Sequence, residues 1–267
     1  MSDKIPLHRF LQQQSAHSRR RILALLEAKE IRINNQIANS INTLICTEKD
    51  SIYIQNKQIK KKTACLYFMY HKPANMLTSM SDPKNRTCIG NILKKISPTL
   101  FPIGRLDKDT TGLILVSNDG DFSHRLAHPK YKMPKRYCAT FHEPIKNDLI
   151  KQLETGLFLE DGPVVCFDCE KTSPNQICLS ITEGRNRILR RCFEHLNLNL
   201  SSLHRISIGP FHLGKLPCGD YKELSTKHVQ DILTNLGYTA TASEACLGGV
   251  VLSDANGQAL DSDVGGC

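Results

Sequence analysis

The sequence predicts an α+β fold on a mixed or antiparallel sheet, with a small basic module at the N-terminus. Strand-like and helix-like segments are interspersed over 64–236, without the regular strand–helix–strand alternation of parallel-sheet proteins. The 267-residue chain is 40% apolar, which is enough for a large hydrophobic core. The first 62 residues carry 12 Lys and Arg against 5 Asp and Glu. We therefore expect a module over 1–50, a linker over 51–63, a main domain over 64–236 and a tail over 237–267.

The N-terminal module is expected to contain two helices and a hairpin. Leu7, Phe10 and Leu11 have helical spacing, and Ser18 is a favourable N-cap for a second helix. The alternating stretch IRINNQIA, 31–38, is typical of a short hairpin.

Three consecutive arginines, Arg19, Arg20 and Arg21, fall in the first turn of that second helix. Cations at this end oppose the helix dipole, so a purely structural role is less natural than contact with an anion. We interpret them as phosphate contacts, the alternative being a solvated charged face.

The lysine-rich stretch 55–62 reads as a linker or an exposed hairpin edge. Beyond it, apolar segments favour strands over 64–70, 112–117, 136–142, 163–168, 176–182 and 203–209. Helices are expected between them, over 121–127, 145–156, 188–196 and 226–236.

The composition favours a polyanionic partner. The formal net charge is +9, which suits nucleic acid first. No apolar run approaches the ~18 residues of a membrane span, and the first residues lack a signal-peptide core, so we expect a cytoplasmic protein that binds no membrane. The 11 cysteines are expected to be reduced thiols, and the single CxxC, Cys166 and Cys169, lacks a second ligand pair for a metal. No Gly-rich phosphate loop is present, so no cofactor is indicated.

The stretch GRLDKDTTGLILVSNDG, 104–120, contains a candidate catalytic carboxylate. Asp107 follows Arg105 by two residues and precedes a segment that reads as buried strand. A lone Asp in a loop is usually a cap or turn residue. Here the flanking apolar segments would hold the carboxylate at the edge of a core, beside a cation that can contact the same ligand.

This stretch resembles the signature of the RsuA-type ribosomal RNA pseudouridine synthases. Five further stretches resemble the same family in the same order: 70–87, 125–141, 153–164, 183–196 and 203–225. The N-terminal HRFL, SRRRI and IRINNQ resemble the alpha-L RNA-binding module, with Lys29 and Asn35 where that motif commonly has glycine. Together the resemblance covers about residues 5–232.

The resemblance implies roles for individual residues. Asp107 would be the catalytic acid, Arg190 would pair with it, and Tyr137 would stack on the target base. Arg105 would hold the flipped nucleotide or fill its vacated place. Ile188 stands where the family often has glutamine. The remaining basic residues of the matching stretches are expected to face RNA: Lys135, Arg136, Arg185, Arg187 and Arg191.

The resemblance also implies the reaction, isomerisation of a specific uridine in ribosomal RNA, or in tRNA, by a monomer without cofactor or metal. Asp107 as nucleophile and Asp107 as base both remain open. The alternatives are a non-catalytic RNA-binding assembly factor that retains the fold and, less favoured, a hydrolase that uses Asp107 with a histidine.

Overall fold

The computed structural model describes residues 4–15, 17–59, 65–146 and 148–236, together with three short strands further on. Those strands are β18 (Thr239–Ala240), β19 (Leu252–Ser253) and β20 (Ala259–Leu260), and they pair in that order. The rest of the expected tail over 237–267 lies outside the described residues.

The N-terminal unit packs two helices against short strands. Its elements are β1 (Lys4–Pro6), α1 (Leu7–Gln14), α2 (Arg19–Glu27), β2 (Ile31–Ile33), β3 (Gln36–Ile37), β4 (Leu44–Cys46), β5 (Ile52–Ile54) and β6 (Lys57–Gln58). Ser18 caps α2 as expected, since its Oγ accepts from the Arg21 amide at 3.2 Å. Leu7, Leu11, Ile22 and Ile31 form the centre of its core.

Two boundaries in this unit concern the predicted linker and the end of helix α2. Strands β5 and β6 belong to a four-stranded sheet of order β3-β2-β5-β6, so residues 52–58 are not a linker. Strand β6 is instead the exposed hairpin edge that was the alternative expectation for this stretch. Pairing with β2 satisfies backbone groups that a linker would leave to water. Helix α2 ends because Lys29 adopts the left-handed conformation, at φ 57°, which glycine usually supplies. In the following hairpin Asn34, not Asn35, takes that conformation, at φ 54°.

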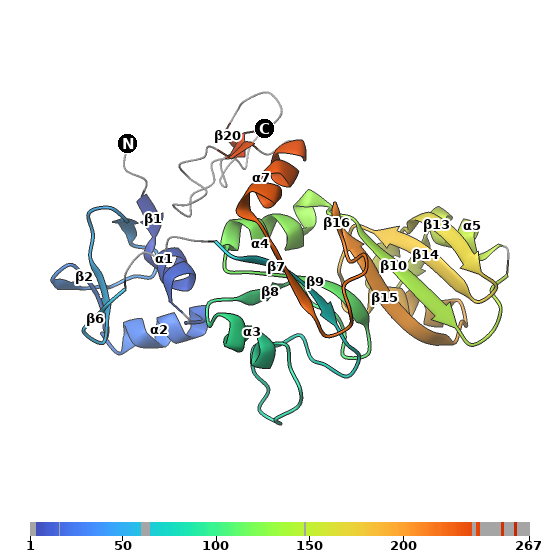
Figure 1. The fold of residues 1–267 in the computed structure, drawn as a ribbon, viewed down its shortest axis with the longest axis horizontal. Coiled ribbons are helices and arrows are strands. Elements are labelled where there is room, and N and C mark those ends of the chain that lie inside the picture. Colours follow the sequence, from blue (N-terminus) through green and yellow to red (C-terminus); the bar gives the residue numbers. More distant parts are fainter. Residues whose placement is uncertain are drawn as a thin grey trace.

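The main unit is built on a nine-stranded sheet (Figure 1). Its path is β13-β14-β10-β15-β9-β7-β17, with β8 and β16 pairing beside it. All pairings are antiparallel except that of β9 with β15, so the predicted mixed sheet and α+β class are confirmed. The strands are β7 (Tyr67–Lys72), β8 (Phe101–Ile103), β9 (Thr111–Ser117), β10 (Lys135–Phe141), β13 (Phe167–Ser173), β14 (Gln176–Ile181), β15 (Leu200–Ile208), β16 (Phe211–His212) and β17 (Tyr221–Leu224).

Helices cover both faces of this sheet. Tyr67 and Met69 of β7 pack toward α4 (Gly120–Ala127) and α7 (Thr226–Asn235). Phe68 and Tyr70, which alternate with them, pack on the opposite face toward α3 (Gly90–Ile96). Figure 1 shows α3 on one side of β7 and β9, and α4 and α7 on the other.

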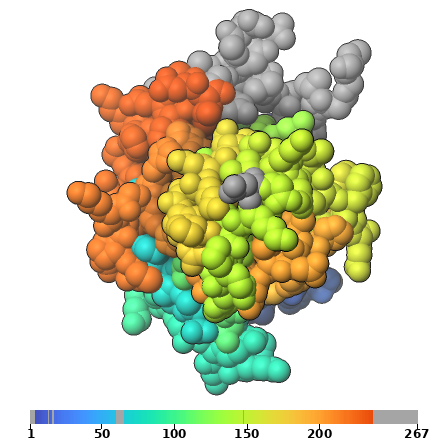
Figure 2. All heavy atoms as spheres, turned by 90° about the vertical axis from the view of Figure 1, so that its right-hand side faces the viewer, coloured from blue at the N-terminus to red at the C-terminus, as the bar shows by residue number. Residues whose placement is uncertain are grey.

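The far half of the sheet has its own core. There α5 (Leu149–Thr155) and α6 (Ile188–His195) pack with β10 and β14, and a hairpin of β11 (Leu157–Leu159) and β12 (Gly162–Val164) lies beside them. Figure 2 looks onto this end, where β13 and β14 are yellow. A 3₁₀ turn, Pro129–Tyr131, completes the elements up to residue 236.

Cys138 and Cys178 form a disulfide, so the expectation of reduced thiols is wrong for this pair. They lie directly opposite each other on β10 and β14, with Cα atoms 4.1 Å apart. Residues directly opposite each other on antiparallel strands have Cβ atoms close enough for a disulfide to join their side chains. The sequence alone does not reveal this register.

Candidate active site

A cavity of about 820 Å³ opens where the two halves of the main unit meet. Its walls come from the loop before β9, the adjoining ends of β10 and β15, and the segment that leads into α6. Residues 77–86 and 126–129 contribute to its rim. Three predicted catalytic residues line it: Asp107, Tyr137 and Arg190.

Asp107 and Arg190 form an ion pair across this cavity. Arg190 Nε lies 3.6 Å from Asp107 Oδ2, and the two side chains are 15% and 31% exposed. Arg190 Nη2 also donates to Thr110 Oγ1 at 3.1 Å. The guanidinium therefore contacts two residues of the loop that precedes β9, Asp107 and Thr110.

Lys72, at the end of β7, donates hydrogen bonds to the backbone of the same loop. This role was not predicted from the sequence. Lys72 is fully buried, and its Nζ donates to the carbonyls of Pro73, Lys108 and Thr110 at 2.8, 3.1 and 2.8 Å. Burial lowers the pKa of Lys72 to about 8. The signal for it is a lysine that ends an otherwise buried strand.

Tyr137 is nearly buried in β10 and is held by a second unforeseen residue, Arg205 of β15. The Tyr137 hydroxyl accepts from Arg205 Nη1 at 3.2 Å, and Arg205 Nε donates to Leu113 O at 2.8 Å. Arg205 is only 3% exposed, and its guanidinium carbon lies 5.8 Å from the Tyr137 ring centroid. An arginine within a buried strand is the signal that could have found it.

Gly112 allows β9 to lie against Arg205. A β-carbon on Gly112 would lie 2.2 Å from the Arg205 carbonyl oxygen, and the residue has φ 107°. Only glycine fits both the close approach and the backbone angle. This contact places Gly112, which follows the Asp107 loop, beside Arg205, which in turn holds Tyr137.

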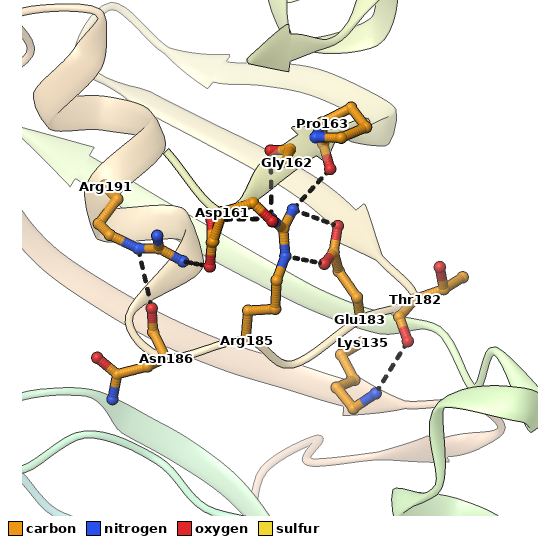
Figure 3. Close-up of polar contacts among 9 residues, drawn as sticks. All are labelled: Lys135, Asp161, Gly162, Pro163, Thr182, Glu183, Arg185, Asn186 and Arg191. Atoms are coloured by element: carbon orange, nitrogen blue, oxygen red, sulfur yellow. Dashed lines mark hydrogen bonds and ion pairs between the residues drawn. The ribbon is translucent and has the colours of Figure 1, made fainter. Parts of the chain in front are cut away.

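The basic residues of β10 face opposite sides. Lys135 lines the cavity, and its Nζ donates to the carbonyls of Met133 and Thr182 at 3.0 and 3.4 Å (Figure 3). Burial lowers its pKa to about 8. Arg136 instead pairs with Glu170 at 3.1 Å and does not line the cavity. Alternation along the strand explains the difference.

The arginines around the start of α6 also divide. Arg187 is exposed and lines the cavity. Arg185, which also lines the cavity, and Arg191, which does not, both form ion pairs with Asp161, and Arg185 pairs with Glu183 as well (Figure 3). The four arginines of 185–191 therefore do not form one basic surface.

The remaining predicted residues lie on the rim or beyond it. Arg105 is exposed at the cavity beside Asp107, and Ile188 is 5% exposed in its wall. Arg19, Arg20 and Arg21 are exposed on α2 of the N-terminal unit, outside the cavity.

In the described ranges, no three His, Cys, Asp or Glu side chains gather in a way that would hold a metal ion. No helix in these ranges has both the length and the apolar character to cross a membrane.

Comparison with known proteins decides the family. Residues 66–195 match the model of the RNA pseudouridylate synthase family. The ribosomal large subunit pseudouridine synthase B of Bacillus subtilis (strain 168) is 32% identical over 230 residues, which cover 82% of this chain and 93% of that protein. The chain belongs to the RNA pseudouridine synthase family. The synthase is therefore an isomerase that acts on RNA, as the sequence resemblance predicted.

Further similarity extends over most of the synthase. The ribosomal small subunit pseudouridine synthase A of Yersinia pestis is 30% identical over 229 residues, covering 85% of this chain and 97% of that one. A solved structure described as a pseudouridylate synthase aligns with a TM-score of 0.61 at 28% identity. The alignment covers 84% of the synthase and 98% of the solved chain, which confirms the fold class.

Proposed function

We propose that the synthase converts a specific uridine of ribosomal RNA into pseudouridine, with Asp107 as the reacting carboxylate. The observation that carries this proposal is the pairing of Asp107 with Arg190 inside a cavity that Tyr137 also lines. The names of the relatives, which are large- and small-subunit ribosomal synthases, support ribosomal RNA as the substrate.

The reaction rearranges one nucleoside without net redox change. The bond from the ribose C1′ to the base N1 breaks, the base turns, and C1′ bonds to C5, whose proton moves to solvent while N1 gains one. Asp107 serves either as nucleophile at C1′ or as base on the ribose. The Arg190 guanidinium, 3.6 Å from Asp107 Oδ2, positions the carboxylate for either route.

Base flipping brings the uridine to Asp107. A base within a helix cannot reach a carboxylate that lies inside a cavity, so the nucleotide must leave its stack, at a cost of a few kcal/mol. Stacking on an aromatic ring returns roughly 1–3 kcal/mol per base. Tyr137 supplies such a ring, fixed by Arg205, and exposed Arg105 is placed to hold the flipped nucleotide.

The RNA strand contacts exposed cations around the cavity and on the N-terminal unit. Arg105 and Arg187 serve at the cavity, Lys135 within it, and Arg19, Arg20 and Arg21 on α2. Arg136, which pairs with Glu170 away from the cavity, has no part in this contact. Such contacts are sequence-independent and bind phosphates, so the choice of uridine depends on the RNA shape that fits the cavity.

The test is nucleotide-resolution mapping of pseudouridine in unmodified transcripts of small-subunit rRNA, large-subunit rRNA and tRNA. We expect the purified synthase to modify a site in a ribosomal transcript and the Asp107→Asn variant to modify none. Modification of tRNA alone would refute the ribosomal substrate. RNA binding without modification by the wild type would favour the non-catalytic assembly factor.

A further inference from the structure

The segment that leads from β14 into α6 is fastened to the β11–β12 turn by two arginines (Figure 3). Asp161 Oδ1 accepts from Arg185 Nη1 at 2.8 Å, and Asp161 Oδ2 accepts from Arg191 Nη2 at 2.8 Å. One carboxylate thus joins Arg185, three positions before the helix, to Arg191 in its first turn.

Arg185 is the more extensively bonded of the two. Its Nη1 also donates to the carbonyls of Asp161 and Gly162 at 2.9 and 3.2 Å, and Nη2 donates to Pro163 O at 2.6 Å. Nε and Nη2 donate to the two oxygens of Glu183 at 2.5 and 3.2 Å. All three guanidinium nitrogens have partners within the protein, so little donor capacity remains for a phosphate.

These contacts hold a helix start that lacks the usual support. Helix α6 begins after Arg187, which adopts a left-handed conformation at φ 48° and provides no side-chain cap. Arg191 Nε donates to Asn186 O at 3.0 Å, so the side chain folds back over this start. A helix end without a cap leaves amide groups unsatisfied and frays readily.

The charges of the cluster balance. Two arginines meet two acids, Asp161 and Glu183. The hydrogen bond from Arg191 lowers the pKa of Asp161, so its carboxylate is ionised at neutral pH. Arg185 and Arg191 therefore add no net positive charge to the RNA-facing surface, unlike exposed Arg187 between them.

We propose that Asp161 is a positioning residue for catalysis, which fixes the first turn of α6 so that Arg190 reaches Asp107. Arg190 lies within that turn, and its 3.6 Å approach to Asp107 is long enough that a small displacement of the helix breaks it. This inference rests on the proposed function, and it replaces RNA contact as the role of Arg185 and Arg191.

The decisive variants are Asp161→Ala and Asp161→Asn, of which the second keeps the shape and removes the charge. We expect kcat on the ribosomal transcript that the wild type modifies to fall about tenfold or more. Misplacement of a reacting group by ~1 Å lowers the rate by up to ~100-fold. KM should stay constant or fall, since two arginines are released toward the RNA. Asp161→Glu should restore part of the rate.

Glu160→Gln is the matched control. Glu160 is the neighbouring exposed acid of the same turn and makes no hydrogen bond or ion pair with the described residues. Its variant should retain the wild-type kcat. A fall in kcat for Glu160→Gln equal to that for Asp161→Asn would make the effect one of general charge and would overturn the proposal.

Hydrogen exchange separates this inference from the proposed function. Without RNA, the amides of 188–191 should exchange faster in Asp161→Asn than in the wild type. If the wild type modifies no transcript, the proposed function fails, while unchanged exchange would still overturn the role of Asp161. Two results for Arg185→Ala would show that the arginines bind RNA instead. These are a higher KM with unchanged kcat, and a smaller salt dependence of RNA binding.

Discussion

At the scale of single residues, Arg190 connects helix α6 to the loop that precedes β9. Its guanidinium faces Asp107 and donates to Thr110, so loss of it removes a charge and a hydrogen bond together. We expect Arg190→Met to lower kcat about 100-fold or more, the range for preorganised electrostatic groups. Arg190→Lys keeps the charge and should retain more activity. Single-turnover rates on the modified transcript measure this, and an unchanged rate in Arg190→Met would refute the role.

Lys72 makes a pH-dependent contribution to stability. Its folded pKa of about 8 lies below the ordinary 10.5, so above pH 8 the unfolded chain binds a proton that the folded chain has released. Stability therefore rises with pH between about 8 and 10.5. At pH 7 Lys72→Met should lower the free energy of unfolding by ~1–3 kcal/mol, because three carbonyls lose their donor.

Chemical denaturation of both proteins from pH 7 to 10.5 checks the sign. The wild type should gain stability relative to Lys72→Met across the upper part of this range. Lys135 titrates similarly but is common to both proteins, so its contribution cancels in the difference. A gap that stays constant or narrows above pH 8 would contradict the assignment.

At the scale of elements, the parallel contact of β9 with β15 depends on Gly112. Gly112→Ala introduces a β-carbon 2.2 Å from a backbone oxygen at a φ of 107°, so we expect a loss of at least ~2 kcal/mol in unfolding free energy. Gly120→Ala is the control, because a β-carbon there meets nothing within 4 Å. Thermal unfolding measures both, and equal stability of the two variants would show that the strands separate at little cost.

The elements that line the candidate site were largely predictable, and their pairing was not. Asp107, Tyr137 and Arg190 come from motifs that the sequence presents in order, and all three line one cavity. Local patterns also indicated β9, β10 and α6. Lys72 and Arg205 were missed because their roles depend on which strands become neighbours, and the pairing of Arg185 with Asp161 could not be predicted because the two residues lie 24 positions apart. Charge counts along a sequence do not reveal partners that folding supplies.

At the scale of the whole molecule, the arginines of α2 lie on the N-terminal unit and outside the cavity. Arg9 of α1 forms an ion pair with Asp121 of α4, which connects the N-terminal unit to the main one. Replacement of Arg19, Arg20 and Arg21 by Gln should weaken RNA affinity and reduce the salt slope by up to ~0.7–0.9 per lost phosphate contact. Arg136→Gln, which removes a cation already paired with Glu170, should leave the slope unchanged. Filter binding at several salt concentrations measures both, and an unchanged slope in the triple variant would exclude α2 from the interface.

The β9–β15 contact also determines how much of the chain must be synthesised before the candidate site can form. Arg205 and the Gly112 backbone meet across more than ninety positions of the chain, and Tyr137 is held by the later of the two strands. While the polypeptide is still being made, every product that stops short of residue 205 lacks the support for its phenol ring. We therefore expect the newborn protein to remain inert toward the ribosome that makes it until most of its length has emerged.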